Sequence, residues 1–367
     1  MPGEVRYELL SVCPHTGARR GRLHTPHGIV ETPAFMPVGT AGTVKTVSSE
    51  ELEALGFRLI LANTYHLSLR PGSDRIERLG GLHKFMGWRG AILTDSGGYQ
   101  VMSLGKMRDI DDQRVRFRSH LDGSEVWLSP ERALQIQWEL GVDIAMVLDE
   151  CPPFPCSRDE AAEAMRRTHL WAERSIRARR AGQSCFGIVQ GGVHDDLRDE
   201  SAAFITSLPF EGFAIGGVCV GEPTEMQYPV VARTARRLPE EKPRYLMGVG
   251  HPRDIVHAVA SGIDLFDCVL PTRMARHHCL YTLKGRVNIM GSEWTDVDAP
   301  VDAQSVFPQT ERYPAAYLRH LFKANEPLGP RLATLHNLAF YARLMEEVRE
   351  AIAAGTWPAL AERYAQA

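Results

Sequence analysis

Residues 144–151 read Ile-Ala-Met-Val-Leu-Asp-Glu-Cys, and this apolar run with its acidic end predicts the fold. A short run of apolar residues is typical of a buried β-strand. After a proline-rich stretch, Arg158–Arg180 has the character of a long helix, and a second apolar run follows at Cys185–Val189. Strand, helix and strand in this order indicate a parallel β-α-β unit.

The same alternation recurs along the chain, with eight apolar runs that end in polar and glycine residues. These runs are Ala34–Val38, Leu59–Ala62, Ala91–Leu93, Ile144–Leu148, Cys185–Val189, Phe213–Ile215, Tyr245–Gly248 and Ile263–Cys268. Eight such units predict an α/β protein, a (β/α)8 TIM barrel. An open doubly wound sheet usually has a glycine-rich nucleotide fingerprint after its first strand, which residues 39–42 do not fit.

The barrel is expected to form a single domain, because TIM barrels run long as single domains. We assign residues 1–367 to this domain and residues 282–335 to a loop-rich subdomain inserted after the eighth strand. Lys284-Gly285-Arg286 predicts a turn within this insertion. Apolar residues at helical spacing predict that residues 330–354 form a closing helix.

The composition argues against a membrane-spanning or disulfide-bonded protein. No stretch approaches about 18 uncharged apolar residues, and the charged start of the chain lacks the apolar core of a secretion signal. Seven scattered cysteines indicate free thiols in a reducing cytoplasm. Because the net charge is −3, a nucleic-acid partner would have to bind a local basic surface.

In a TIM barrel the chemistry takes place at the C-terminal ends of the strands. Asp95 and Asp267 each stand at the end of an apolar run. In the cleavage of glycosidic bonds, one carboxylate acts as a nucleophile or stabilises charge while another moves a proton. A single aspartate after a strand is more often a helix cap, but capping does not explain polar groups at so many strand ends.

Other strand ends carry groups that could recognise a purine base. Asp149 could accept two adjacent N–H groups of guanine, while Gln190 and the Gly217 amide could bind the opposite edge. Tyr99 and Met247 could sandwich the flat ring. The residues therefore indicate an enzyme that acts on the bond between a purine and a sugar.

Five longer motifs cover the strand ends. They are Glu31-Thr-Pro-Ala-Phe-Met-Pro-Val-Gly39, Leu93-Thr-Asp-Ser-Gly-Gly-Tyr-Gln100, Phe186-Gly-Ile-Val-Gln-Gly-Gly192, Arg244-Tyr-Leu-Met-Gly-Val-Gly250 and Phe266-Asp-Cys-Val-Leu-Pro-Thr-Arg273. Together they resemble the bacterial tRNA-guanine transglycosylase (queuine tRNA-ribosyltransferase) family, from about residue 5 to about residue 355. The resemblance implies a pentosyltransferase that replaces guanine by a 7-deazaguanine at the wobble position of tRNA.

The resemblance also implies a role for each catalytic residue. Asp267 matches the nucleophile that forms a covalent ribosyl-enzyme at C1′, and Asp95 matches the acid/base for the departing and arriving purine. Asn63 resembles a residue that orients the nucleophile or the ribose. Two inversions at C1′ give retention, and the covalent step protects the ribose from water. The target base must be flipped out of its stack to reach the pocket.

The family's base pocket matches seven positions of this chain. They are Asp149, Gln190, Gly217, Tyr99, Met247, Cys151 and Val220. At Cys151 and Val220 the chain resembles the bacterial version, which takes an aminomethyl precursor base. The eukaryotic version differs at both positions and admits the bulkier queuine.

The chain departs from the family at the zinc site of the insertion. The three cysteine positions fall on Ser305, Phe307 and Thr310, and only the histidine is kept, as His336. One imidazole without thiolates does not make a structural zinc site. The adjacent His-His-Cys of residues 277–279 lacks the spacing of metal ligands, so we expect no zinc and no other cofactor.

A second departure concerns the basic segment that meets the anticodon stem-loop in relatives. Here residues 288–293 read Asn-Ile-Met-Gly-Ser-Glu, so at least two cations are missing and an acid is present. Because phosphate contacts supply much of the affinity for nucleic acids, this change predicts weaker tRNA binding. Four cations remain that could contact the tRNA, namely Arg273, Arg276, Lys284 and Arg286.

Three hypotheses therefore stay open. The first is base exchange on tRNA without zinc, which the complete set of catalytic residues favours. The second is the same ribosyl transfer on a small nucleoside or nucleotide, in 7-deazapurine biosynthesis, or on another nucleic acid. The altered basic segment favours it. The third, a non-catalytic partner subunit, ranks last because the catalytic residues are present. Relatives form homodimers partly through the zinc-containing region, so this chain could also form a homodimer.

Overall fold

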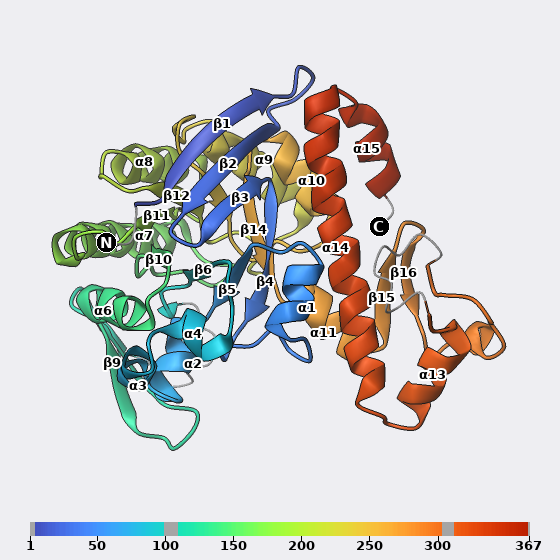
Figure 1. Cartoon of the computed structure of the whole chain (residues 1–367). Coiled ribbons are helices and arrows are strands. Elements are labelled where there is room, and N and C mark those ends of the chain that lie inside the picture. The colour runs from blue at the N-terminus through green and yellow to red at the C-terminus, as the bar shows by residue number, and fades with distance from the viewer. Residues whose placement is uncertain (1–3, 99–108, 303–311, 366–367) are drawn as a thin grey trace.

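The structure of the chain, a computed structural model, describes residues 4–98, 109–302 and 312–365. Eight parallel strands close into a barrel with helices around it, which confirms the predicted (β/α)8 fold (Figure 1). In barrel order they are β4 (Ala34–Gly39), β5 (Leu59–Ala62), β6 (Ala91–Thr94), β10 (Ile144–Met146), β11 (Cys185–Val189), β12 (Gly212–Ile215), β13 (Arg244–Leu246) and β14 (Leu265–Cys268). Each strand agrees with its predicted run to within two residues at either end.

The last barrel strand pairs with the first. Leu265 lies opposite Ala34, and Cys268 lies opposite Pro37, in parallel register. Every residue of β5 and β6 is buried, because side chains fill the inside of the barrel and helices cover its outside. Strands with two buried faces are apolar throughout, which explains why the runs show no polar–apolar alternation.

Helices connect the strands and cover the barrel. α7 (Arg158–Ala178) begins at a capping box, in which Ser157 and Glu160 each accept the other's backbone amide. The other helices are α1 (Ser49–Ala54), α2 (Thr64–Leu69), α3 (Ser73–Arg78), α4 (Leu82–Met86), α6 (Pro130–Leu140), α8 (Asp195–Thr206), α9 (Thr224–Ala235), α10 (Pro252–Ala260), α11 (Leu270–Arg276), α13 (Ala315–Lys323), α14 (Leu328–Ala354) and α15 (Trp357–Tyr364). None of the helices within the described residues has the length and apolar character that crossing a bilayer requires.

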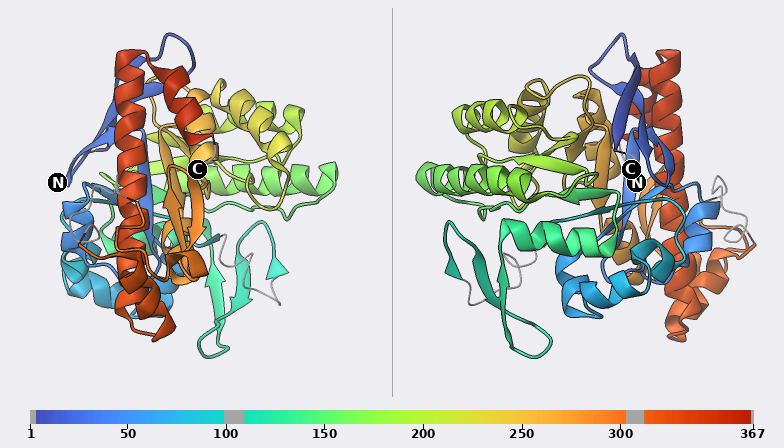
Figure 2. Two further views of the ribbon diagram at one scale, coloured as in Figure 1. Left: turned by 90° about the vertical axis from the view of Figure 1, so that its right-hand side faces the viewer. Right: turned by 60° about the vertical axis from the view of Figure 1, so that its left-hand side comes forward.

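Two small antiparallel sheets, which the sequence analysis did not predict, are added to the barrel. The first precedes the barrel and consists of β1 (Arg6–Val12), β2 (Arg19–Thr25) and β3 (Gly28–Thr32). The second projects from the barrel beside α6 (Figure 2) and consists of β7 (Asp109–Ile110), β8 (Val115–Arg118) and β9 (Glu125–Leu128). In β8, buried Val115 and Phe117 alternate with exposed arginines, as in a strand with one solvated face.

A buried ion pair joins the N-terminal sheet to the residue that directly precedes the last barrel strand. Nη2 of Arg19 in β2 lies 2.8 Å from Oδ2 of Asp264, and both side chains are almost fully buried. Tyr7 of β1 donates its hydroxyl to Oδ1 of Asp264 at 2.9 Å. Burial raises the pKa of Asp264 and Arg19 lowers it, so the carboxylate relies on its partners to stay ionised.

Removing this carboxylate is expected to destabilise the fold strongly. The change Asp264→Ala leaves the Arg19 guanidinium buried without its counter-charge, which costs about 3–5 kcal/mol. Urea denaturation should show this loss. The matched change Asp74→Ala breaks the exposed Asp74–Arg78 pair, which solvent screens, and should leave the stability nearly unchanged. Equal losses in the two variants would contradict a stabilising role for the buried pair.

The region after β14 packs around an apolar cluster of its own. β15 (Cys279–Thr282) pairs with β16 (Gly285–Asn288), and a 3-10 helix, η1 (Ser292–Trp294), follows. The turn between the two strands is at Leu283 and Lys284, one residue earlier than predicted, because Gly285 and Arg286 belong to β16. The buried members of the cluster are Ala275, Leu280, Ile289, Ala315, Leu318, Leu321, Phe322, Leu332 and Ala333. The hairpin and α13 lie beside α14, on the right of Figure 1.

Candidate active site

The two carboxylates of the predicted pair lie at the C-terminal ends of β6 and β14. Asp95 follows β6 directly and is buried. Its Oδ1 accepts the backbone amide of Thr64 at 2.9 Å, and its Oδ2 accepts the side-chain amide of Asn63. The structure therefore places Asn63 against Asp95, whereas the resemblance assigns Asn63 to the nucleophile or the ribose.

Asp267 lies on β14 and is held by donors from the neighbouring strand and the loop after it. Tyr245 of β13 donates its hydroxyl to Oδ1 of Asp267 at 2.6 Å, and the Gly248 amide donates to the same oxygen at 2.8 Å. Gly248 has a φ of 77°, a left-handed conformation that favours glycine. Burial raises the pKa of Asp267, and the two hydrogen bonds oppose that rise.

Two residues of the predicted base pocket, Asp149 and Gln190, come together from adjacent strand ends. Nε2 of Gln190 donates to Oδ2 of Asp149 at 2.7 Å, and both side chains are buried. A Cβ on Gly216 would lie 2.7 Å from Nε2 of Gln190, and a Cβ on Gly217 would collide with its Oε1. Only glycine therefore leaves room for the amide at these two positions. Three of the groups that were predicted to recognise a purine thus lie side by side.

The pKa of Asp149 gives the pocket an expected pH dependence. Burial raises this pKa to about 6. Because only the ionised carboxylate accepts both N–H groups of a guanine edge, the KM for free guanine should rise as the pH falls below about 6. In Asp149→Asn the KM should be roughly 10- to 100-fold higher, through loss of a charged hydrogen bond, and should not titrate. Exchange kinetics with labelled guanine would measure both; a wild-type KM constant down to about pH 5 would contradict this role.

Two buried charged residues support the pocket, and sequence reasoning missed both. Arg198 of α8 is fully buried. It donates to three carbonyl oxygens, those of Val189 at 3.0 Å, Gly192 at 2.7 Å and Gly217 at 3.2 Å. Glu222 is also buried and accepts the Val220 amide at 3.0 Å. In a sequence, a helical arginine and a loop glutamate are indistinguishable from ordinary surface charges, which is why no signal identified them.

The remaining predicted pocket residues are placed as follows. Cys151, Val220 and Met247 are each partly buried beside the strand ends. Burial and the neighbouring Asp149 raise the pKa of Cys151 to about 12, so its thiol stays protonated. Tyr99, the second half of the predicted base sandwich, lies outside the described residues.

The four predicted nucleic-acid contacts follow the strand that carries Asp267. Arg273 and Arg276 belong to α11, while Lys284 and Arg286 lie on the β15–β16 hairpin. Arg273, Lys284 and Arg286 are exposed. Arg276 is partly buried, and its Nη1 donates to the carbonyl of Thr272 at 2.6 Å. Three of the four guanidinium or ammonium groups therefore face solvent.

The residues at the family's zinc position do not fit a structural zinc ion. Nε2 of His336 donates to the carbonyl oxygen of Tyr281 at 2.8 Å, which leaves a lone pair only on Nδ1, and one imidazole nitrogen without thiolates does not make a structural zinc site. Sequence positions 305, 307 and 310, which hold no cysteine, lie outside the described residues. The small cavity beside His336 is lined mostly by apolar side chains: Pro300, Val301, Asp302, Tyr313, Leu318 and Leu332.

A second group of potential metal ligands, His27, His83 and Asp143, is better described as a hydrogen-bonded clamp. Nδ1 of His27 and Nε2 of His83 lie 2.8 and 3.0 Å from the two oxygens of buried Asp143. The rings stack with centroids 3.6 Å apart and planes 13° from parallel. A metal binds near the plane of an imidazole at about 2.1 Å from its nitrogen, and no single ion can satisfy both stacked rings.

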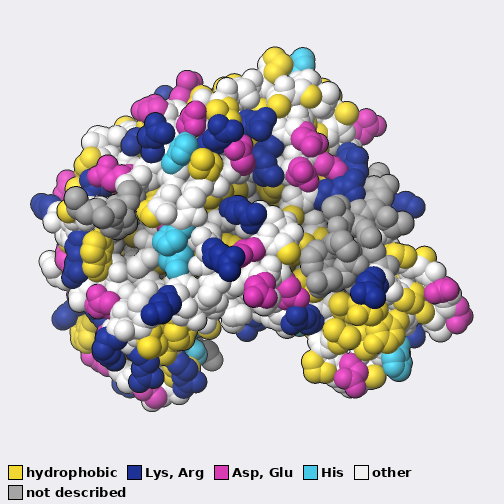
Figure 3. Space-filling model, viewed as in Figure 1, with side chains coloured by type: hydrophobic (Ala, Val, Ile, Leu, Met, Phe, Trp, Pro, Cys, Tyr) yellow, Lys and Arg dark blue, Asp and Glu magenta, His cyan; other side chains and the backbone are white. Residues whose placement is uncertain are grey.

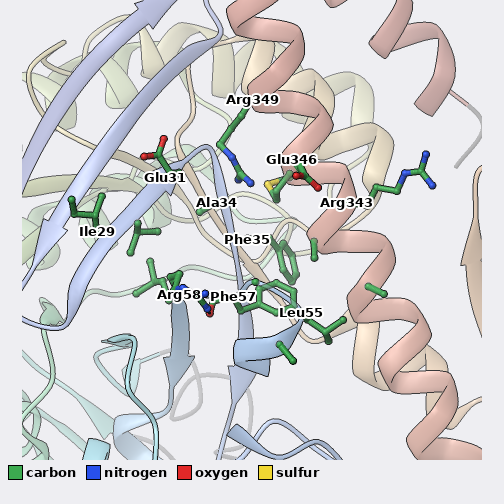
Figure 4. A pocket seen from close by; sticks show the side chains of 17 residues that line it. Ile29, Glu31, Ala34, Phe35, Leu55, Phe57, Arg58, Arg343, Glu346 and Arg349 are labelled. Carbon is green, nitrogen blue, oxygen red and sulfur yellow. The ribbon is translucent and has the colours of Figure 1, made fainter. Parts of the chain in front are cut away.

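A cavity of about 700 Å³ lies away from the carboxylate pair, between α14 and the starts of the first barrel strands (Figure 4). Phe35 and Leu55 line it together with Glu31 and Arg349. None of the predicted site residues lines it. Chemistry in TIM barrels takes place at the opposite ends of the strands, so the cavity is not the active site.

Two carboxylates with separate hydrogen-bond donors, together with the paired Asp149 and Gln190, indicate an enzyme that acts on a purine's glycosidic bond. The known proteins that this chain resembles belong to the same class of enzyme. A family model described as queuine tRNA-ribosyltransferase matches residues 13–367. Two proteins of that name are similar over most of their length. The one from Bacillus subtilis (strain 168) is 51% identical over 350 residues, 95% of this chain and 92% of that protein. The one from Pelotomaculum thermopropionicum is 54% identical over 341 residues, 93% of this chain and 92% of that protein. This chain belongs to the queuine tRNA-ribosyltransferase family, whose members are pentosyltransferases.

Proposed function

We propose that this chain exchanges the wobble guanine of tRNA for a 7-deazaguanine base. The observation that carries the proposal is the presence of Asp95 and Asp267 at one barrel mouth, each with its own hydrogen-bond donors. The name of the similar proteins, queuine tRNA-ribosyltransferase, supports tRNA as the substrate. Cys151 and Val220, which resemble the bacterial version of the family, favour a precursor base smaller than queuine.

Asp267 is the nucleophile in this proposal, and Asp95 moves the protons. An oxygen of Asp267 forms a bond to C1′ of the ribose as the bond between C1′ and the guanine nitrogen breaks. The carboxyl group of Asp95 donates a proton to the departing guanine, and the resulting carboxylate takes a proton from the incoming base. The incoming ring nitrogen then attacks C1′ and displaces Asp267, so that two inversions retain the configuration.

Asp149, Gln190 and Gly217 recognise the base while it is outside the RNA stack. The ionised Asp149 accepts the two N–H groups of the guanine-like edge, and Gln190 and the Gly217 amide bind the other edge. Met247 and Tyr99 are the two residues that we assign to the faces of the ring. Both the departing and the arriving base share these edges, so one pocket serves both half-reactions.

The substrate proposal is tested by exchange of labelled guanine into two acceptors. One is an unmodified anticodon stem-loop RNA, and the other is a guanosine nucleotide. Arg273, Lys284 and Arg286 are exposed and could bind the RNA backbone. Exchange into the RNA alone is the expected result. Exchange into the nucleotide alone would overturn the tRNA proposal and support the small-molecule alternative, which the acidic Glu293 in the altered segment favours.

We also propose that residues 282–335 form an inserted subdomain that folds without zinc. Its support is the apolar cluster around Leu318, Phe322 and Leu332, together with the absence of cysteine at positions 305, 307 and 310 of the sequence. Dialysis against a strong chelator should leave the unfolding midpoint unchanged, and metal analysis should find no stoichiometric zinc. A chelator-induced loss of stability would contradict the proposal.

A homodimer through this subdomain is the assembly that we propose. Hydrophobic side chains gather on the surface over α13, at the lower right of Figure 3. Tyr317 of α13 is exposed there and stacks on Tyr313, with ring centroids 5.5 Å apart. Light scattering should give twice the mass of one chain for the wild type, and the mass of one chain for Tyr317→Asp. A monomeric wild type would contradict the proposal.

A further inference from the structure

We infer that Tyr245 is a positioning residue for the nucleophile, and that Oδ2 of Asp267 is the oxygen that attacks C1′. The inference rests on the proposed function, in which Asp267 forms the covalent bond. It is carried by the way in which the hydrogen bonds are distributed over this one carboxylate.

Both donors that reach Asp267 bind the same oxygen. The Tyr245 hydroxyl lies 2.6 Å from Oδ1, and the Gly248 amide lies 2.8 Å from it. These two donors use both lone pairs of Oδ1. Within the described residues no donor lies within hydrogen-bond distance of Oδ2, and Asp267 is only partly buried. Oδ2 therefore keeps its lone pairs for a substrate at the mouth of the barrel.

Tyr245 is built into the barrel more firmly than a loop residue could be. It belongs to β13 and is almost fully buried, and it pairs with Leu265 of β14, two residues before Asp267. Donors held by rigid strands orient a reacting group better than donors on loops. Burial and the nearby Asp267 raise the pKa of Tyr245 well above its usual value, so the hydroxyl stays a donor.

The hydrogen bonds to Oδ1 have different effects on the two half-reactions. When Oδ2 bonds to C1′, the carboxylate loses its charge and Oδ1 becomes the carbonyl oxygen of an ester. When the incoming base attacks, the electron pair of the C1′–Oδ2 bond returns to the carboxylate, and negative charge reappears at Oδ1. Donors aimed at developing negative charge stabilise that transition state. Tyr245 should therefore act mainly on the release of the ribose from Asp267.

The change Tyr245→Phe tests this role, because it removes one hydroxyl and keeps the ring. On an anticodon stem-loop RNA the variant should still form the covalent adduct, but the adduct should react with incoming base roughly 100-fold more slowly. The adduct should consequently accumulate during turnover. The kcat should fall by a larger factor than the KM for the base. Tyr7→Phe is the matched control, because it removes a hydroxyl that donates to buried Asp264 away from the mouth. It should leave both rates unchanged.

The pH dependence of adduct formation in Tyr245→Phe separates a positioning role of Tyr245 from general damage to the fold. The titratable groups near Asp267 are Tyr245 on β13, Asp95 after β6, Cys219 after β12 and Cys268 on β14. The Tyr245 hydrogen bond lowers the pKa of Asp267, so its loss should raise that pKa. Since the attacking carboxylate must be ionised, the acidic limit of adduct formation should move to higher pH. A purely structural defect would lower stability without moving this limit.

The possible outcomes distinguish a failure of this inference from a failure of the proposed function. If the wild type forms no adduct with the RNA, the proposed function fails. If the wild type forms the adduct but Tyr245→Phe keeps its release rate and its pH profile, the role of Tyr245 fails while that of Asp267 stands. A crystal structure of the trapped adduct should show ribose on Oδ2 and both donors on Oδ1; ribose on Oδ1 would overturn the assignment.

Discussion

Asp267→Asn should abolish the covalent ribosyl-enzyme and lower base exchange by roughly 10⁴-fold or more. A neutral amide is a far weaker nucleophile than a carboxylate and cannot form the ester to C1′. The substitution nearly preserves size, and its carbonyl oxygen can still accept from Tyr245 and Gly248. The loss should therefore reflect chemistry and not a disturbed fold. Denaturing gels of the enzyme with labelled anticodon stem-loop RNA would show the missing adduct.

A matched control for this variant exists in α10. There Asp254 accepts a hydrogen bond from the hydroxyl of Tyr228 at 2.6 Å, away from the carboxylate pair. Asp254→Asn makes the same chemical change in a similar contact and should keep adduct formation. Asp267→Asn should also bind the RNA with nearly wild-type affinity, because the exposed cations are unchanged. An adduct that persists in Asp267→Asn would show that another residue is the nucleophile.

Asp95→Asn should lower exchange by about 10²- to 10⁴-fold, the usual contribution of a general acid or base. Without its carboxyl group the enzyme cannot give a proton to guanine or take one from the incoming base. The defect should appear in kcat, since Asp95 is not among the groups that we assign to base binding. Rapid-quench measurements of adduct formation would report on the first half-reaction alone.

A changed leaving group gives the sharpest test of Asp95 as a proton donor. Guanine methylated at N7 carries a positive charge in the RNA and departs as a neutral base without protonation. With such an RNA, Asp95→Asn should form the adduct at close to the wild-type rate. If the variant is equally impaired with guanine and with the methylated base, Asp95 acts in some way other than proton donation.

The barrel could be predicted because each of its strands is buried on both faces. Runs such as Leu59–Ala62 are apolar throughout, and length and flanking polar residues separate them from helices. The N-terminal sheet lacked such a signal. β2 holds three arginines among its seven residues. One of them, Arg19, is buried against Asp264, which supplies its charge partner from far along the chain. A pairing across more than two hundred residues leaves no local pattern to read.

The structure brings together the predicted site residues that stand at strand ends. Asp95, Asp149, Gln190 and Asp267 needed only the topology to bring them together. The supporting residues could not be found in this way. Tyr245 reads as one more apolar strand residue, although its hydroxyl meets Asp267 across two adjacent strands. Its role depends on a register between strands, which the sequence does not show.

The central claim is that Asp267 becomes covalently bonded to the ribose of the RNA. The most direct measurement is mass spectrometry of the wild-type adduct, trapped by acid quench during exchange, nuclease-treated and digested to peptides. We expect a ribose-derived mass on the peptide that contains residues 266–273, with fragment ions that place it on Asp267. A ribose-derived mass on Asp95, or on any peptide without Asp267, would contradict the account.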